Sequence, residues 1–275
     1  MKNNLPNYDF LGSVYHGTNA HELEESLISI ESQSFKPKNI IIMIDGLIKQ
    51  NVIEVLNKFV DRIPIKIIPI KKNIGLGLAL RKGLKECKSK IVLRFDTDDI
   101  NFSNRAYYTV KELTENNIDI VGSNIQEFNN NPKEFISKKI MPTSHSQIKK
   151  TIFFRNPINH PTVGFIKDSI LKLDGGYRHF PFYEDYDLWI RAIFSGLRFK
   201  NINKTLVAIR INSQRSRRRG VNLIIMECKL LKTFFQVSIF HSFLFFPILI
   251  FRIIFTLLPL KIINLLFVHI FRKKI

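Results

Sequence analysis

The feature that most constrains this sequence is an alternation between short β-branched runs and longer amphipathic stretches, which extends from Gly12 to about Arg210. Runs rich in Ile and Val predict strands, and stretches with apolar residues at helical spacing predict helices. Their alternation is typical of βαβ units, in which helices cover both faces of a parallel sheet. We therefore predict an α/β fold over this part of the chain.

Two of the expected strands end at acidic residues. The second is followed by Asp45-Gly46, and the fourth runs directly into Asp96-Thr97-Asp98-Asp99. Open α/β sheets bind ligands outside the carboxyl ends of their strands, so these residues are expected at a ligand crevice. Strands are expected at Leu11–Tyr15, Asn39–Ile44, Ile65–Ile70 and Ile91–Phe95, and helices at Ala20–Glu31, Ile48–Phe59 and Gly77–Cys87.

Composition excludes several classes of protein. Of the 275 residues, 45% are hydrophobic and 24 are Phe, so a large core can form and disorder is excluded. A net charge of +19 indicates a polyanionic partner. Charge alone does not decide whether this partner is nucleic acid, an anionic membrane surface or a phosphorylated substrate.

The cysteines and the N-terminus indicate the compartment. Cys87 and Cys228 form no CxxC pattern, which argues against a disulfide framework or structural zinc and favours a reducing cytosol. Residues 1–10 lack the apolar stretch of a secretory signal.

The composition changes sharply after the basic cluster Arg215–Arg219. From Phe234 to Phe251 no residue is formally charged, and only Arg252 and Lys261 interrupt the apolar run from there to Phe271. A single membrane crossing would place basic residues on both sides, against the positive-inside tendency. We favour helices that lie in the membrane interface, with Lys and Arg reaching lipid phosphates. A helical hairpin that crosses and returns, or a core helix of a larger globule, remains open.

The sequence Asp96-x-Asp98-Asp99 is the strongest local signal for chemistry. Three carboxylates within four residues repel one another, and a hard divalent cation such as Mg²⁺ or Mn²⁺ can hold them together. The alternative is a surface turn that caps a helix beginning at Asn101–Arg105. Asp45 and the Asn73–Gly77 loop favour the metal site, because all would converge on one sheet edge.

A second acidic group, Glu184-Asp185, precedes residues with helical spacing. Carboxylates at a helix N-terminus are favoured in the ionised form, so one of them can act as a general base. The alternative is a simple helix cap with Trp189 in the core.

These motifs together resemble inverting family 2 glycosyltransferases of the GT-A fold, and in particular the amylovoran and O-antigen subgroup of bacterial polysaccharide enzymes. The resemblance covers nearly all of the first 210 residues. The matching segments, in order, are Ser13-Val14 to Asn19, Asp45-Gly46, Asn73-x-Gly75, Asp96–Asp99, Asn156–Val163 and Tyr183–Trp189.

The resemblance implies a Rossmann-like GT-A fold with a mixed, mostly parallel sheet flanked by helices. It implies a nucleotide-sugar-binding and catalytic domain over 1–220, and basic, apolar, membrane-associating helices over 221–275. The opening turn lacks the family's proline, so no base-stacking role is assigned there, and Arg81 stands where the family commonly has Asn. No role is assigned to His160.

The resemblance also implies site roles. Asp45 and Asn73 would bind the nucleotide, Asp45 through the uracil, and Asp96 would contact the ribose or the metal shell. Asp98, with Asp99 nearby, would hold Mn²⁺ or Mg²⁺. In the second acidic group, Asp185 is expected to be the catalytic base and Glu184 to orient the acceptor.

The expected reaction moves a hexose, galactose or glucose, from a UDP-sugar to a polyprenyl-diphosphate-linked saccharide with inversion, in bacterial O-antigen or exopolysaccharide synthesis. A surplus of positive charge beside the apolar tail would attract the anionic cytoplasmic face of the bacterial inner membrane. No nucleic-acid motif is evident, so nucleic acid is not expected as a partner. A catalytically silent nucleotide-binding scaffold of a membrane assembly complex is the alternative function.

Overall fold

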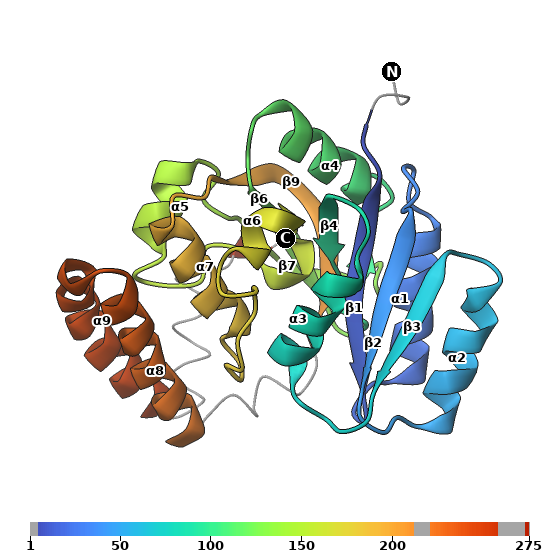
Figure 1. The fold of residues 1–275 in the computed structure, drawn as a ribbon, viewed down its shortest axis with the longest axis horizontal. Helices are drawn as coiled ribbons and strands as arrows, with labels where there is room; N and C mark the ends of the chain where they lie inside the picture. Colours follow the sequence, from blue (N-terminus) through green and yellow to red (C-terminus); the bar gives the residue numbers. More distant parts are fainter. Residues whose placement is uncertain (1–4, 212–220, 258–272, 275) are drawn as a thin grey trace.

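The computed structural model describes residues 5–211, 221–257 and 273–274, and Figure 1 shows their arrangement. The basic cluster Arg215–Arg219, Lys261 and Phe271 lie outside the described residues. The first half contains β1 (Tyr8–Tyr15), α1 (Ala20–Glu31), β2 (Asn39–Asp45), α2 (Gln50–Val60), β3 (Ile65–Ile70), α3 (Leu76–Glu86), β4 (Ile91–Arg94), β5 (Ile100–Asn101) and α4 (Arg105–Glu115).

The second half contains more antiparallel pairing and the C-terminal helices. Its elements are β6 (Ile120–Phe128), β7 (Phe135–Lys139), α5 (His145–Thr151), the 3₁₀ turn η1 (His160–Thr162), β8 (Gly164–Ile166), α6 (Lys167–Leu171), α7 (Glu184–Phe194), β9 (Phe199–Arg210), α8 (Val221–Val237), α9 (Ile239–Leu257) and β10 (Lys273–Lys274).

All strands of the described residues join one sheet in the order β10-β7-β6-β8-β4-β1-β2-β3, with β9 alongside β5 and β6. The β1–β2, β2–β3, β1–β4 and β6–β9 pairs are parallel, and β8 and β7 are antiparallel to their neighbours. The predicted mixed, mostly parallel sheet flanked by helices is therefore confirmed. Because β1 lies between β2 and β4, the direction of strand order reverses there, and such a reversal opens a crevice at the carboxyl ends.

The sequence pattern located the first elements closely. The helix Ala20–Glu31 and the strand Ile65–Ile70 have the predicted bounds, and the other early elements differ by one to three residues at their ends. Asn19 explains the sharp start of α1, since its side-chain oxygen accepts hydrogen bonds from the amides of His21 and Glu22. Gly75 precedes α3 with a φ of +87°, a conformation that glycine adopts without strain.

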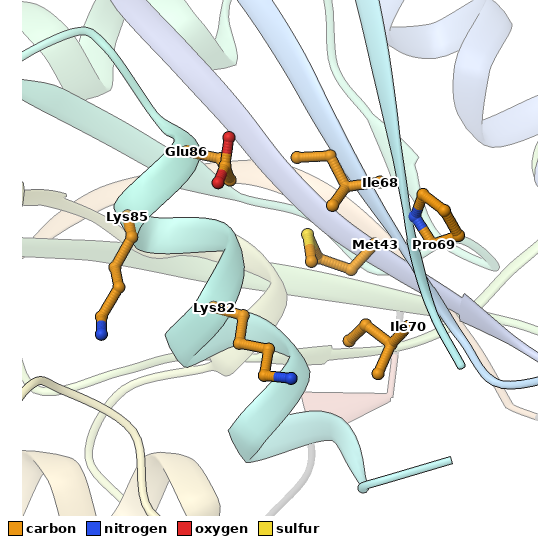
Figure 2. A pocket seen from close by; sticks show the side chains of 7 residues that line it. All are labelled: Met43, Ile68, Pro69, Ile70, Lys82, Lys85 and Glu86. Atoms are coloured by element: carbon orange, nitrogen blue, oxygen red, sulfur yellow. The ribbon is translucent and has the colours of Figure 1, made fainter. Parts of the chain in front are cut away.

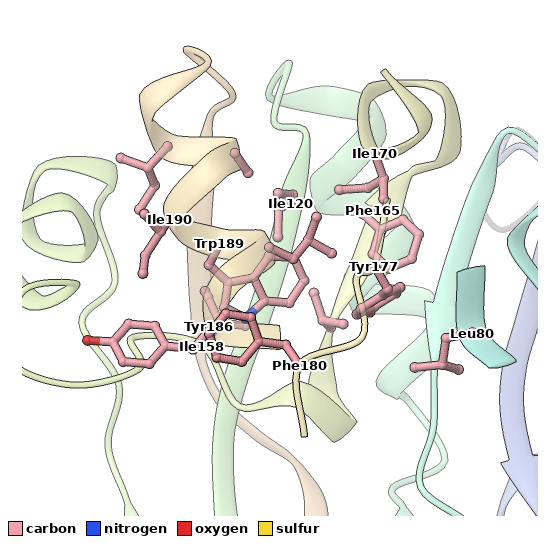
Figure 3. Packing of buried hydrophobic residues seen from close by; sticks show 14 of the residues in the cluster. Leu80, Ile120, Ile158, Phe165, Ile170, Tyr177, Phe180, Tyr186, Trp189 and Ile190 are labelled. Carbon is pink, nitrogen blue, oxygen red and sulfur yellow. The ribbon is translucent and has the colours of Figure 1, made fainter. Parts of the chain in front are cut away.

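Two apolar cores lie on opposite faces of the sheet. One is formed by the sheet with α1, α2 and α4, and includes Leu27, Leu56 and Val110. In the other, Trp189 of α7 is fully buried among Ile120, Ile158, Phe165 and other residues, as Figure 3 shows. This second core fixes α7 against the sheet, which matters because α7 carries Glu184 and Asp185.

Helices α8 and α9 form a hairpin that packs on α7 (Figure 1). Leu230, Phe234, Phe245 and Leu249 are buried on its inner side and belong to the same core as Trp189. Its other side leaves large apolar residues in solvent: Ile225, Phe235, Ile239, Phe240, Phe243, Phe246, Ile250, Phe251 and Ile254. Within the described ranges, no helix has both the length and the apolarity that a membrane span requires.

Candidate active site

Three aspartates cluster beyond the carboxyl end of β4. One carboxylate oxygen from each of Asp96, Asp98 and Asp99 can be chosen so that all three lie within 4.8 Å of one another. These residues do not cap α4, because that helix begins at Arg105 and has no side-chain cap. Asp99 is instead buried and accepts a hydrogen bond of 3.0 Å from the backbone amide of Arg210 at the end of β9. The alternative of a capping turn is therefore wrong.

Burial and mutual repulsion disfavour the ionised form of the carboxylates in this cluster. Burial, followed by the negative charges of Asp96 and Glu22, raises the pKa of Asp98 to about 7. Burial and the neighbouring Asp98 and Asp96 also raise the pKa of Asp99 well above its usual range. Mutual repulsion of this kind is relieved by a bound cation, and carboxylate oxygens are the ligands that Mg²⁺ and Mn²⁺ prefer. The residues present thus fit a divalent metal ion.

Two arginines compensate part of this negative charge. Arg94, whose side chain is buried on β4, forms an ion pair with Asp96. Arg210 donates through Nε to the backbone oxygen of Asp98 at 3.3 Å and pairs with Glu25 of α1. Both arginines therefore hold the backbone and the carboxylates of the acidic cluster in place.

The loop that follows β3 is attached to the end of β2 through Asp45. The two carboxylate oxygens of Asp45 accept hydrogen bonds from the amides of Ile74 and Gly75 at 2.8 and 2.9 Å. The Asn73 side chain in turn donates to the backbone oxygen of Asp45 at 3.0 Å. Asp45 and Asn73 thus form one unit at the sheet edge, and each carboxylate oxygen keeps a further lone pair.

Glu184 and Asp185 occupy the first turn of α7, as predicted. Asp185 accepts a hydrogen bond of 2.6 Å from the side chain of Asn156 and one of 2.8 Å from the amide of Tyr186. Both bonds, together with the helix dipole, favour the ionised carboxylate and fix its orientation. Phe182, two residues before Glu184, has a φ of +71°, which is a strained conformation for an aromatic residue.

Tyr177 is a fully buried tyrosine whose pKa is affected by both acidic groups. Burial is the main cause that raises the pKa of its phenol far above the ordinary value, and the carboxylates of Asp185, Glu184 and Asp96 raise it further, whereas Arg94 opposes them. The charges of both acidic groups therefore influence the pKa of one hydroxyl group. Tyr177 also lies 3.0 Å from Nε2 of His160.

The Asn73–Gly77 loop also approaches the second acidic group. A Cβ atom at Gly77 would lie 2.2 Å from the backbone oxygen of Arg178 and 3.2 Å from Cβ of Glu184. A Cβ atom at Gly75 would lie 3.4 Å from the ring of His179. The N-termini of α3 and α7 are therefore neighbours, and the predicted site residues from four segments gather at one sheet edge.

The sequence alone did not identify several residues of this site. Arg94 could have been recognised, because it is the single charged residue within the apolar run Ile91–Phe95. Nothing in the sequence indicated Glu22 or Arg210, since α1 and the end of β9 reach the acidic cluster only in the folded protein. Arg81, the noted departure from the family pattern, lies against Gly175, where a Cβ atom would be 2.5 Å from its guanidinium.

Two surface hollows lie apart from these acidic residues. Figure 2 shows one between β3 and α3, lined by Met43, Ile68, Pro69, Ile70, Lys82, Lys85 and Glu86. The other is lined by Asn129–Asn131 and Glu134–Ile136. Neither contains a residue of the two acidic clusters, so neither is the predicted site.

Comparison with solved structures identifies the fold. Residues 1–349 of TarS from S. aureus, in complex with UDP-GlcNAc, superpose with a TM-score of 0.63 at 15% identity, over 82% of this chain and 66% of that one. The mannosyltransferase PcManGT from Pyrobaculum calidifontis, in complex with GDP-Man and Mn²⁺, has a TM-score of 0.63 at 15% identity, over 88% and 70%. These identities establish only the fold, which is that of the GT-A glycosyltransferases.

Comparison of sequences is more specific. The profile of Glycosyl transferase family 2 matches residues 14–173. An Escherichia coli UDP-Gal:alpha-D-GlcNAc-diphosphoundecaprenol beta-1,3-galactosyltransferase is 32% identical over 99% of both chains. The amylovoran biosynthesis glycosyltransferase AmsE of Erwinia amylovora is 30% identical over 94% of this chain and 97% of its own. The chain therefore belongs to glycosyl transferase family 2, as its motifs predicted.

Proposed function

We propose that this protein transfers a hexose from a UDP-sugar to a saccharide carried on a polyprenyl diphosphate, with inversion at the anomeric carbon. The observation that carries the reaction is the pair of carboxylate clusters at Asp96–Asp99 and Glu184-Asp185: the first follows β4, and the second adjoins the N-terminus of α3, where a Cβ atom at Gly77 would lie 3.2 Å from Cβ of Glu184. The substrate class is supported by the end-to-end similarity to the Escherichia coli galactosyltransferase. O-antigen or exopolysaccharide assembly is the corresponding process, and galactose or glucose the corresponding sugar.

The donor nucleotide would bind at the edge formed by Asp45, Asn73 and Asp96. Asp45 keeps the Asn73–Gly75 loop in position, and its remaining lone pairs can accept from the uracil. Mn²⁺ or Mg²⁺ would be held by Asp98, Asp96 and Asp99, and would neutralise negative charge on the departing nucleoside diphosphate.

The acceptor would be activated from the opposite side of the sugar. Asp185 accepts the proton of the attacking hydroxyl as the new bond to the anomeric carbon forms, and the bond to the UDP oxygen breaks with its electron pair. Asn156 keeps the receiving carboxylate oriented, and Glu184 lies beside it to bind the acceptor sugar. Base and leaving group on opposite faces require a single displacement, so an α-linked donor gives a β-linked product.

We further propose that residues 1–220 form the catalytic domain and that residues 221–275 attach it to the cytoplasmic face of the bacterial inner membrane. The outward apolar side of the α8–α9 hairpin supports this division, because Phe243, Phe246 and Ile250 recur at helical spacing and are 46–69% exposed. A membrane bearing anionic lipids also matches the net charge of +19.

The direct test uses the purified full chain, labelled UDP-sugars and a short GlcNAc-diphosphate-lipid acceptor. Asp185→Asn is expected to lower kcat by about 100- to 10,000-fold, the usual contribution of a general base. Removal of divalent metal by EDTA is expected to abolish transfer, and Mn²⁺ or Mg²⁺ to restore it. Asp168→Asn, an exposed aspartate of α6, is the control and should leave kcat unchanged.

Full transfer by Asp185→Asn, or by metal-stripped protein, would refute the mechanism. Binding of UDP without sugar transfer to any acceptor of a broad panel would instead support the nucleotide-binding scaffold.

A further inference from the structure

Arg252 lies within the most apolar helix of the described chain, yet its side chain is turned toward the protein. Its neighbours Phe251 and Ile254 are exposed, whereas the Arg252 side chain is only 16% exposed. An arginine at a membrane interface ordinarily extends toward lipid phosphates and water. Arg252 does not follow this expectation from the sequence, and its position therefore needs a partner within the fold.

That partner is the first turn of α7 together with a buried glutamate of α8. The Arg252 guanidinium donates to Glu227 Oε1 at 2.8 Å, to the hydroxyl of Tyr186 at 3.2 Å and to the hydroxyl of Tyr183 at 3.4 Å. It also lies over both tyrosine rings, 5.3 Å and 5.8 Å from their centroids. The guanidinium of an arginine presents five donors in a rigid planar fork, whereas a lysine ammonium is a compact point charge with three donors on a flexible stem.

The two tyrosines bracket the proposed catalytic carboxylates. Tyr183 precedes Glu184 at the N-terminus of α7, and Tyr186 follows Asp185. No side chain caps the helix at Tyr183, so other contacts must fix this turn. The hydroxyl of Tyr183 donates to Glu227 at 2.5 Å, and that of Tyr186 donates to the backbone oxygen of Ile152 at 2.5 Å.

A second contact attaches the same hairpin one turn further along the helix. Thr233 of α8 donates to the buried carboxylate of Asp187 at 2.8 Å, and Asp187 is paired with Arg191. The hairpin therefore touches α7 through directional hydrogen bonds as well as through its apolar core. Of these contacts, those of Arg252 and Glu227 reach the residues directly beside Glu184 and Asp185.

We propose that Arg252 is a positioning residue for the transfer reaction. By holding Tyr183 and Tyr186 it fixes the first turn of α7, so that Glu184 and Asp185 face the acceptor only while the α8–α9 hairpin is seated. This inference rests on the proposed role of Asp185 as the base. Helix α9 would then have two functional faces. Its outer face meets the membrane, and its inner face supports the carboxylate that accepts the proton.

The test measures kcat and both KM values for Arg252→Met and Arg252→Lys in detergent, with the soluble short acceptor, so that membrane binding plays no part. Arg252→Met is expected to lower kcat about 100-fold, the effect of a displacement near 1 Å of a reacting group. The KM for the UDP-sugar should change less than about threefold, because the donor edge is formed by other elements. Arg252→Lys should recover part of kcat, since it keeps the charge but not the fork.

Lys232→Met is the matched control, because it removes one positive charge from an exposed position of the same hairpin. It should leave kcat unchanged. If Arg252→Met does not fold, the double variant Tyr183→Phe with Tyr186→Phe removes only the two hydroxyl groups that Arg252 contacts. A similar loss of kcat with an unchanged melting temperature would support the proposal.

A kcat for Arg252→Met or for the double tyrosine variant within threefold of the wild type would overturn the proposal. Equal losses of donor binding and kcat would also overturn it, because they indicate a general structural role. Asp185→Asn is measured in parallel to separate the two proposals. If Asp185→Asn is active, the proposed base is wrong, whereas an inactive Asp185→Asn beside a normal Arg252→Met refutes only the role of Arg252.

Discussion

Single residues at the acidic edge show how charge is balanced in this fold. Asp96 and Asp99 could be assigned to a ligand crevice from the sequence, because they follow an apolar strand that has to be central in the sheet. Arg210 could not, since it lies 111 positions from Asp99 and reaches it only when β9 pairs with β5 and β6. Acidic residues at the end of one strand can be predicted from the local sequence. The basic residues that neutralise them cannot, because long-range strand pairing brings them there.

His145, which lies outside the candidate active site, is expected to make the stability of the fold depend on pH. Its Nδ1 accepts a hydrogen bond of 3.2 Å from the amide of Phe199, which requires the ring to be neutral at that atom. Burial, and then the charges of Lys149 and Arg198, lower the pKa of His145 below its ordinary 6.5. Below pH 6.5 the unfolded chain therefore binds more protons at this residue than the folded protein, and stability falls as the pH falls.

The measurement is the melting temperature of the wild type and of His145→Gln between pH 7.5 and 5.5. The wild type should lose more of its melting temperature over this range than His145→Gln, because Gln cannot take up a proton. His16→Gln, at an exposed position, should follow the wild type. Equal losses for the wild type and His145→Gln would contradict the assigned shift.

At the scale of elements, the site depends on two helix N-termini that lie side by side. The start of α3 was predictable to within one residue, because Gly75 and Gly77 interrupt the pattern after an apolar strand. That α3 would meet α7 was not predictable from either segment alone. Their contact depends on Trp189 and the rest of the second core, which places α7 on the same face of the sheet as α3.

Gly77 tests this contact. A Cβ atom there would lie 2.2 Å from the backbone oxygen of Arg178, so Gly77→Ala must push α3 away from the segment that leads to Glu184. Overpacking of this kind costs about 1–3 kcal/mol, and the higher helix propensity of alanine returns up to about 1 kcal/mol. We expect a net loss of stability of about 1–2 kcal/mol and a fall in kcat/KM of more than about tenfold, because a reacting group is displaced.

Denaturant unfolding and steady-state kinetics of Gly77→Ala check both numbers. Lys85→Ala, at an exposed position of the same helix, is the control and should change neither quantity. Gly77→Ala with wild-type stability and kcat/KM would mean that the two helix ends do not meet in solution.

At the scale of the molecule, one core joins the sheet, α7 and the C-terminal hairpin, while the hairpin's outer side remains uncovered. The sequence indicated an apolar tail that needed a partner, but it could not indicate which residues face the protein. Leu230, Phe234 and Phe245 join the core, and Phe243 and Phe246 do not, because helix packing divides an almost uniformly apolar sequence into two sides.

The outward residues are expected to decide membrane binding. Replacement of Phe243, Phe246 and Ile250 by Ser removes three apolar side chains that are 69%, 52% and 46% exposed. Each contributes about 1 kcal/mol or more if it enters the lipid interface, so the triple variant should partition at least about 100-fold less onto vesicles that contain anionic phosphatidylglycerol. Flotation of the full chain with such vesicles measures this partition.

The control variant replaces three apolar residues of similar exposure elsewhere, Ile28, Val60 and Ile136, by Ser. It should float with the vesicles as the wild type does, and salt should weaken binding of both because the attraction between basic protein and anionic lipid is screened. The hairpin variant should still transfer sugar to a soluble acceptor, since its three positions face away from α7. Equal flotation of the hairpin variant and the wild type would exclude this surface as the membrane contact. If the control variant lost as much vesicle binding as the hairpin variant, binding would depend on the total exposed apolar area rather than on this helix face.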